Sequence, residues 1–513
     1  MTCSKLFSGD LPELTDEIIQ HFRDDHNTLY SCTLVNRLWC RLAIPLLWED
    51  PFLKKSLLFI EIYLRRLNDD DNDKLKEYWN IDNPYSNTLF NYPSFIKRLN
   101  TKKFISSIEK LSHQLIKGEF SIMDSNKLAR LICDLLFKLF VENEANLHTF
   151  EFEMINDYSF ITVELLLKSL KFICNMKNIE LFNLRMAVTD DDEANVQIED
   201  FIIKVFRSQQ NIKKILFEHV EIDEFQPTNN PILLSLSLSL LKESNCSNTL
   251  NRIIFFETDF KDIDVLNEAF EELNVLESVH ILYCYNINSD FIQQIIDLSK
   301  PFKLKSLFMK EKVQHGLLQL LLQKSGNYLE NIGFESSMYK MEHIKHFTNY
   351  CTNIKFFKLY RYNNQIISPS LNLIKNIEKT LNYLSIDFHR NNHVSSDDIK
   401  LSSTIFLKLG NFLPPRLEYL GLTLMINAMD FNTFLSKSHN TIIRKLLIKN
   451  LMTESDLLPY IKEHIMKKER VRYLAIEDDI SEDDIKEFEL HNIQIVNIDD
   501  LRINIFNFII EKY

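Results

Sequence analysis

The sequence predicts an α/β solenoid, in which short parallel strands line a concave side and helices cover a convex side. The first observation is a phrase of the form apolar, two variable, apolar, variable, apolar, which recurs from residue 147 to the end of the chain. The second is that amphipathic helical stretches, such as residues 159–173 and 455–468, lie between the phrases. The third is the length of 513 residues, which exceeds one ordinary core and suits a repeat array.

The first element is an apolar helical segment, "LPELTDEIIQHFRDDHNTLYSCTLVNRLWCRLAIPLLWED", that runs from Leu11 to Asp50. Leu14, Ile18 and Phe22 recur every four residues, which predicts a helix over residues 11–22. We expect a second helix over about 28–38 and a short third helix before Pro45. A unit this small buries little apolar surface by itself, so its apolar side chains must pack on the rest of the chain or on another protein.

The phrases "LPEL", "LVNRLW" and "PLLW" in this segment resemble the F-box family over residues 8–50. The loop "RDDHNTL" departs from the family pattern because it is polar where many relatives carry a turn of the form "p-x-x-L". F-box segments dock on the Skp-type adaptor of cullin-RING ubiquitin ligases. The resemblance therefore implies an adaptor, and through it a cullin, as partners. The motif also contains Arg37, and the adaptor-binding residues that the resemblance implies are Leu11, Pro12, Ile18, Leu34, Val35, Trp39, Leu47 and Trp48.

Residues 51–145 form the second element, which we predict to be a helical connector. Apolar residues at helical spacing run through residues 57–67 and 128–139. Asp69, Asp71 and Asp73 alternate as in a calcium-binding loop, but such a loop needs Gly at position 74 and Glu at position 80. The sequence has Lys74 and Asn80, so a solvated acidic turn is predicted instead.

The third element, residues 146–513, contains about 13 copies of the repeated phrase. The copies begin at residues 147, 176, 212, 250, 276, 304, 329, 354, 381, 417, 443, 471 and 493. Most intervals fall within the range of 20–29 residues that is typical of leucine-rich repeats. The segment therefore resembles degenerate leucine-rich repeats of the ribonuclease-inhibitor-like style. The chain as a whole is similar to fungal-type F-box proteins with a leucine-rich-repeat tail, which implies a horseshoe with a parallel concave sheet.

Composition and motifs argue against several classes of function. A net charge of −13 disfavours a nucleic-acid-coating protein, although it leaves room for a local basic patch. Seven glycines and the absence of a phosphate-binding glycine motif disfavour nucleotide-dependent enzymes. His389 and His393 stand four residues apart in a polar stretch, where we predict a loop and not a metal site. We expect no catalytic residue, no metal and no cofactor, and therefore a protein that is not an enzyme.

The sequence also predicts where in the cell the protein is found. The first ten residues lack the apolar core of a signal peptide, and the longest apolar run, residues 231–242, is too short to cross a bilayer. None of the eight cysteines stands in a CxxC pair. We expect a cytoplasmic and/or nuclear protein that binds neither membrane nor nucleic acid.

The later repeats carry candidate residues for binding a target protein. If the register is right, the variable positions of each phrase face the concave side. These positions combine aromatic and cationic residues, the types that anchor protein interfaces. Together with Lys449 they form a positive island, which predicts an acidic or phosphorylated target. The candidates are Phe356, Lys358, Tyr360, Arg361, Tyr383, Tyr419, Lys445 and Tyr473.

We therefore predict a substrate-recognition subunit of a Skp-cullin-F-box ubiquitin ligase, which binds the adaptor by its F-box and an unknown protein by its repeats. The alternative is a non-catalytic leucine-rich scaffold without a role in ubiquitin transfer. A third reading is a leucine-rich sensor that binds a ligand. The sequence does not name the target.

Overall fold

The computed structural model divides the chain into two compact units, and each is described here by itself. Unit 1 comprises residues 1–251 with 272–275, and unit 2 comprises residues 252–271 with 276–513. The structure describes residues 11–53, 57–76, 78, 89–116, 122–154, 179–186, 192–219, 231–243, 245–335, 339–360, 364–388, 396–452, 456–477 and 480–513.

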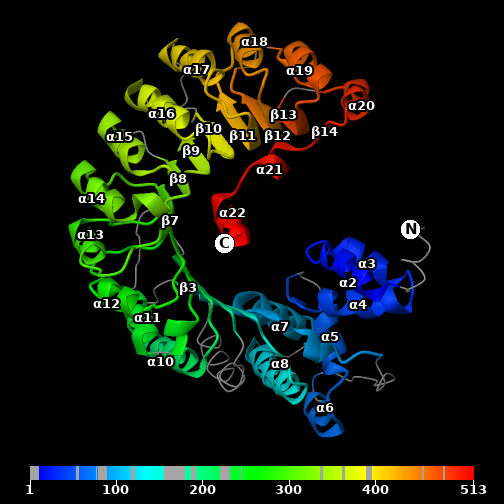
Figure 1. The fold of residues 1–513 in the computed structure, drawn as a ribbon. Helices are drawn as coiled ribbons and strands as arrows, with labels where there is room; N and C mark the ends of the chain where they lie inside the picture. Colours follow the sequence, from blue (N-terminus) through cyan, green and yellow to red (C-terminus); the bar gives the residue numbers. More distant parts are fainter. Residues whose placement is uncertain are drawn as a thin grey trace. The chain divides into compact units, whose positions relative to one another are not determined.

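Unit 1 begins with helices and continues with four parallel strands (Figure 1). The strands pair in the order of the sequence and are β1 (Arg98–Asn100), β2 (Thr149–Met154), β3 (Leu181–Met186) and β4 (Lys214–His219). The helices before the second strand are α2 (Pro12–Gln20), α3 (His26–Thr33), α4 (Arg37–Leu47), α5 (Leu58–Leu64), α6 (Asp69–Leu75), η1 (Tyr92–Phe95), α7 (Thr101–Leu115) and α8 (Ile122–Glu142). Those after it are α10 (Asp192–Ser208), α11 (Pro231–Glu243) and η2 (Asn245–Asn248).

Unit 2 is a regular array of parallel strands and helices. Its strands are β5 (Arg252–Phe256), β6 (Ser278–Leu282), β7 (Leu304–Met309), β8 (Asn331–Phe334), β9 (Phe356–Tyr360), β10 (Tyr383–Asp387), β11 (Arg416–Leu424), β12 (Ile442–Asn450), β13 (Val471–Ile476) and β14 (Gln494–Ile495). Its helices are α12 (Leu266–Glu272), α13 (Ser289–Ile296), α14 (His315–Ser325), η3 (Gly326–Tyr328), α15 (Met341–Tyr350), α16 (Asn364–Asn376), α17 (Ser396–Leu409), α18 (Ala428–Lys437), α19 (Leu458–His464), η4 (Met466–Lys468), α20 (Glu482–Leu490), α21 (Ile498–Leu501) and α22 (Ile505–Lys512).

The arrangement within unit 2 confirms the predicted α/β solenoid. Each strand pairs in parallel with the next one in the sequence, from β5 to β14. Helices α13–α20 follow the outer side of the strands, while α21 and α22 lie on the inner side (Figure 1). We call the inner side of these strands the concave face.

The repeated phrase coincides with the strands. Every phrase from residue 147 onward meets one of the strands β2–β14. The phrase placed at residue 176 is out of register, because β3 starts at Leu181 and the buried pattern starts at Ile179. The connector contains an unpredicted strand, β1, which pairs with β2 and extends the ladder of unit 1 by one repeat. At three residues, β1 is too short for its alternation to stand out in the sequence.

The core of the repeats comes from equivalent positions on successive strands. Leu384, Leu420, Leu446 and Leu474 are paired neighbours across β10–β13 and are all buried. Full burial of one such side chain stabilises the fold by roughly 1.5–3 kcal/mol. These leucines are buried because neighbouring repeats stack on one another. A single repeat would leave its leucine exposed, so the repeats are stable only as a stack.

The N-terminal helices begin and end at different residues from those predicted. The expected helix over 28–38 is divided into α3 and α4, because the Asn36 side chain accepts a hydrogen bond from the Trp39 N–H and starts a new helix. The third helix, α4, continues through Pro45 to Leu47 instead of ending before the proline.

The predicted acidic turn is wrong. Residues 69–75 form α6, which Asn68 caps, and Asp71 is buried. Its carboxylate lies 2.5 Å from the Lys138 ammonium of α8 and 2.6 Å from that of Lys74. Burial raises the pKa of Asp71, but hydrogen bonds from Lys138 and Lys74 outweigh burial and hold the pKa below its usual range.

Of the other expected helices, residues 455–468 contain α19, while residues 159–173 lie outside the described part of the chain. No helix within the described residues has both the length and the apolar character that crossing a membrane requires.

Candidate functional site

The first candidate surface is the N-terminal trihelical bundle, α2–α4. Its core is closed by Ile19, Leu29, Cys32 and Ala43, all buried. Asp25 starts α3 by accepting hydrogen bonds from the N–H groups of Asn27 and Thr28, each at 3.1 Å. The three short helices are therefore held by caps and by a small shared core.

Three of the predicted adaptor-binding residues are not available to an adaptor. Trp39, Leu47 and Trp48 are buried within unit 1. The Trp48 ring lies 4.2 Å from the ring of Tyr92 and 4.7 Å from that of Phe59, measured between centroids. Trp48 therefore joins the bundle to the connector, because residues 51–145 supply the aromatic side chains that surround its ring.

The other predicted residues remain at the surface. Leu34 is 73% exposed, Val35 is 46% exposed, and Pro12 is also exposed, whereas Leu11 and Ile18 are half-buried. Sequence reasoning missed Tyr30, which is 64% exposed and lies one helical turn before Leu34. Tyr30 stands four residues before Leu34, and this spacing could have placed both residues on the same face of a helix. We call Tyr30, Leu34 and Val35 the apolar corner of the bundle.

A buried carboxylate fixes the bundle to the start of the sheet. Glu49 receives Lys97 Nζ at 2.7 Å and Arg23 Nε at 3.3 Å. The Glu49 carbonyl accepts hydrogen bonds from the backbone N–H groups of Lys97 and Arg98, both at 2.9 Å. The bundle that carries the apolar corner is therefore tied to the start of β1 by Glu49.

The second candidate surface is the concave face of unit 2. Strand register places Phe356, Tyr383, Tyr419, Lys445 and Tyr473 next to one another on β9–β13. We call these residues the concave row. Lys358 and Tyr360 lie further along β9, and both are half-buried. Arg361 lies outside the described residues.

The concave row is not the exposed surface that the sequence predicted. Phe356 and Tyr419 are fully buried. The reason is that residues 497–513, which we call the C-terminal segment, lie across the concave face (Figure 1). The Phe508 ring lies 5.0 Å from the rings of both Phe356 and Tyr383, and Leu501 packs against Tyr419.

The C-terminal segment packs on the concave face through buried apolar side chains. Leu501, Ile505 and Ile509 are buried. Burial of three such side chains contributes on the order of 5–9 kcal/mol. A target therefore meets the segment and what surrounds it, and not the covered part of the row.

A polar cluster holds the end of the segment. Tyr513 Oη donates a hydrogen bond to Glu330 Oε2 at 2.8 Å and accepts one from Asn331 Nδ2 at 3.0 Å. Lys305 and Lys355 lie 2.5 and 2.8 Å from the same carboxylate. Burial raises the pKa of Glu330, but hydrogen bonds from Lys305, Lys355 and Tyr513 outweigh burial and lower the pKa to about 2.

The predicted positive island is largely neutralised. Lys358 pairs with Glu335 at 2.6 Å, and Lys449 pairs with Glu477 at 2.7 Å. Lys445 is exposed, and no carboxylate of the described residues is paired with it. The available positive charge therefore lies further along the array, near β12 and β13, than the sequence indicated.

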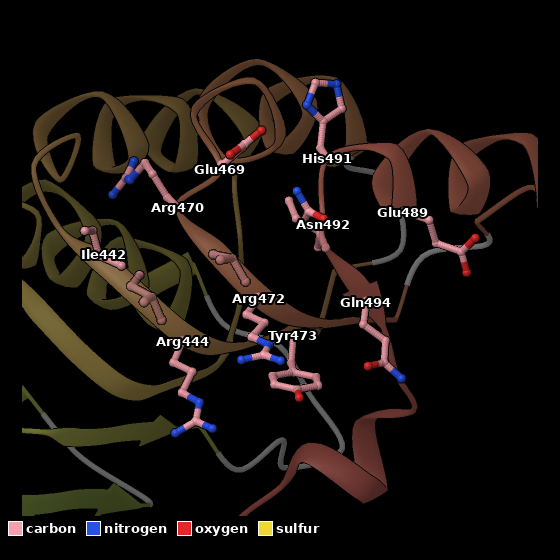
Figure 2. A pocket seen from close by; sticks show the side chains of 13 residues that line it. Ile442, Arg444, Glu469, Arg470, Arg472, Tyr473, Glu489, His491, Asn492 and Gln494 are labelled. Atoms are coloured by element: carbon pink, nitrogen blue, oxygen red, sulfur yellow. The ribbon is translucent and has the colours of Figure 1, made fainter. Parts of the chain in front are cut away.

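A pocket of about 660 Å³ opens at this end of the array, between the starts of β12 and β13 and the turn before β14. We call it the edge pocket. Figure 2 shows Arg444, Arg472, Tyr473 and Gln494 projecting to the same side of it. Arg470 also lines the pocket, but it is buried and donates to the Thr441 carbonyl at 2.9 Å, so its role is structural.

Nothing in the described part of the chain forms a metal centre. No group of three His, Cys, Asp or Glu side chains there is arranged to hold a metal ion. His389 and His393 lie outside the described residues. The cysteines of the repeats, Cys284 and Cys351, are buried, and burial raises the pKa of each thiol to about 12.

Among known proteins, similarity to this chain is found in solved structures. No protein-family model matches the chain. No curated protein matches it either. Among solved structures, a chain from the crystal structure of the Rad7 and Elc1 complex in yeast is similar, with a TM-score of 0.41 and 12% identity. The alignment covers 78% of this chain and 93% of that chain.

Proposed function

We propose that this protein is the substrate-recognition subunit of a Skp-cullin-F-box ubiquitin ligase. The N-terminal bundle binds a Skp-type adaptor, and the repeats of unit 2 bind the target protein. The protein itself performs no chemistry in this role, since it brings the target to the ligase.

The observation that supports the proposal is the apolar corner. Tyr30, Leu34 and Val35 are exposed although the core of the bundle is already complete. Exposed apolar side chains that gather on one surface mark a protein-protein contact more often than isolated ones do. Their position on the segment that resembles an F-box makes a Skp-type adaptor the expected partner.

The test is adaptor capture by a charged variant of the corner. Leu34→Asp with Val35→Asp should reduce capture of a purified Skp-type adaptor at least tenfold, because both charges would be buried against it. Leu490→Asp is the matched control, since Leu490 is an apolar residue of unit 2 that is 83% exposed. Equal capture by the variant and the control would refute the assignment.

A second measurement separates a ligase receptor from a scaffold. The intact chain, expressed in cells with the proteasome inhibited, should co-purify with both the adaptor and a cullin. Recovery of the adaptor without a cullin would indicate a scaffold that uses the bundle for assembly alone.

A further inference from the structure

We propose that the edge pocket binds a phosphorylated side chain of the target protein, with Arg444 and Arg472 as the residues that hold the phosphate. The inference rests on the proposed function and deepens it, because it names the chemistry of the target. It follows from the geometry of two strands and from the charges around them.

The two arginines are direct neighbours in the sheet. Ile443 pairs with Val471 and Lys445 pairs with Tyr473, so Arg444 and Arg472 lie opposite each other on β12 and β13. Adjacent strands are about 4.8 Å apart. Figure 2 shows both side chains projecting to the same side of the strands. Like charges in this arrangement repel each other, and an anion held by both groups would relieve the repulsion.

Neither arginine is committed to a strong internal partner. Arg444 Nη1 lies 3.2 Å from Glu418 Oε2, but about half of each side chain is exposed, and exposed pairs of this kind contribute little. The Arg472 guanidinium lies over the Tyr473 ring, 5.5 Å from its centroid, and pairs with no carboxylate of the described residues. Both guanidinium groups can therefore donate hydrogen bonds to a ligand.

Two carboxylates also lie around the pocket. Glu469 and Glu489 line it, but Figure 2 shows them apart from the two guanidinium groups. Lys445, next to Arg444 on β12, is exposed, but it lines the groove beside the C-terminal segment together with Glu418, Asp500 and Glu511, and not the edge pocket. The exposed charged groups that β12 and β13 themselves contribute to the pocket are therefore Arg444 and Arg472, in a chain whose net charge is −13.

A phosphate fits this site better than a carboxylate does. Arginine forms paired hydrogen bonds with phosphate oxygens, and a phosphate with nearly two negative charges balances two arginines. The pocket volume of about 660 Å³ has room for a phosphorylated side chain and its neighbours. Ile442, which is 54% exposed in the wall of the pocket, offers an apolar contact to a flanking residue.

Coverage by the C-terminal segment and ion pairing leave few places on the concave face where a phosphate could bind. The C-terminal segment covers Phe356 and Tyr419, and Lys358 and Lys449 are neutralised by Glu335 and Glu477. Of the predicted positive island, Lys445 is the one described residue that is exposed without a paired carboxylate, and it is the chain neighbour of Arg444 on β12.

The experiment uses the full chain and a degenerate peptide pool with a fixed central phosphoserine or phosphothreonine, compared with the same pool without phosphate. The wild-type chain should retain the phosphorylated pool at least tenfold more strongly. The variant Arg444→Glu with Arg472→Glu should lose this preference. Arg502→Glu is the matched control, because Arg502 is exposed and lines the grooves beside the C-terminal segment.

Three outcomes would overturn the proposal: no preference for phosphorylated peptides, a preference that survives the double substitution, or a preference that Arg502→Glu removes. Binding to vesicles rich in anionic lipid, without binding to the peptides, would point to a membrane instead and would also overturn it. Adaptor capture by the double variant should equal that of the wild type. Failure of adaptor capture in every chain would instead count against the proposed function.

Discussion

At the scale of single residues, the concave face is packed so closely that a methyl group matters. The Tyr419 ring lies across the strand position of Gly421, where a Cβ atom would come within 2.4 Å of the tyrosine Oη and 2.9 Å of the ring. Tyr419 cannot move away easily, because it is buried against Leu501 and Leu447.

Gly421→Ala should therefore lower the free energy of unfolding by about 1–3 kcal/mol, the usual cost of overpacking a core. Gly316→Ala is the control, since no atom lies within 4 Å of its added Cβ and the residue is in α14. There, alanine should stabilise by about 0.5–1 kcal/mol. Chemical denaturation of both variants measures the difference, and equal stabilities would contradict the placement of Tyr419.

The half-buried Glu330 carboxylate makes stability depend on pH. Its pKa in the folded chain is about 2, below the ordinary value of 4.5. A carboxyl whose pKa is lowered by folding stabilises the folded state above the unfolded pKa, and this contribution is lost as pH falls through the folded pKa. The contribution should be on the order of 2–3 kcal/mol at neutral pH and should disappear between about pH 4.5 and 2.

Glu330→Gln should lose this stabilisation at neutral pH and should flatten the pH dependence of the unfolding free energy in that acid range. Glu418→Gln, which removes an exposed carboxylate paired with Arg444, should leave both nearly unchanged. A wild-type profile that the Glu330 substitution does not alter would show that Tyr513 and the two lysines do not hold this carboxylate.

At the scale of elements, α22 is the part of the fold whose position has the largest consequence. It contacts strands that are far from it in the sequence: Phe506 meets Phe256 of β5, and Phe508 meets Phe356 of β9. Its placement decides which concave residues a target can reach.

Hydrogen exchange should find the amides of α22 nearly as protected as those of β9 and β10, because opening the helix exposes Ile505 and Ile509 together with the row beneath them. Ile509→Ala should destabilise unit 2 by about 2–4 kcal/mol, while Glu511→Ala, at an exposed position, should change little. Fast exchange throughout α22 would mean that the segment opens readily and that the concave row is accessible after all.

Local pattern explains why the strands were predictable and the C-terminal segment was not. The alternation in "YLSID" or "YLGL" repeats at a regular interval, and the same spacing fixes the register that aligns Tyr383 with Tyr419. The apolar face of Ile505 and Ile509 is equally consistent with a helix on the outer side of the strands. The sequence around Tyr513 does not indicate that this residue contacts Asn331, which lies 182 residues earlier in the chain.

The candidate sites, too, were only partly predictable from the sequence. The sequence identified Leu34 and Val35, which are exposed, but a motif does not distinguish a residue that contacts a partner from one that builds the bundle, as Trp39 and Trp48 do. Likewise, Lys358 and Lys449 were visible as positive charges, while Glu335 and Glu477 became their partners only through strand register.

At the scale of the whole molecule, each unit carries a separate candidate binding surface. Unit 1 presents the apolar corner of the bundle, and unit 2 presents the edge pocket. The two tasks should therefore be separable: substitutions at Leu34 and Val35 should leave phosphopeptide binding intact, and substitutions at Arg444 and Arg472 should leave adaptor capture intact. Loss of both activities in either variant would show that the two surfaces are not independent.

The most direct test of the central claim is a hydrogen-exchange footprint of the intact chain with and without a purified Skp-type adaptor. The account predicts that the adaptor slows exchange in residues 26–37, which contain Tyr30, Leu34 and Val35, and leaves exchange in β9–β13 unchanged. No complex, or a complex whose protection lies outside the N-terminal bundle, would contradict it.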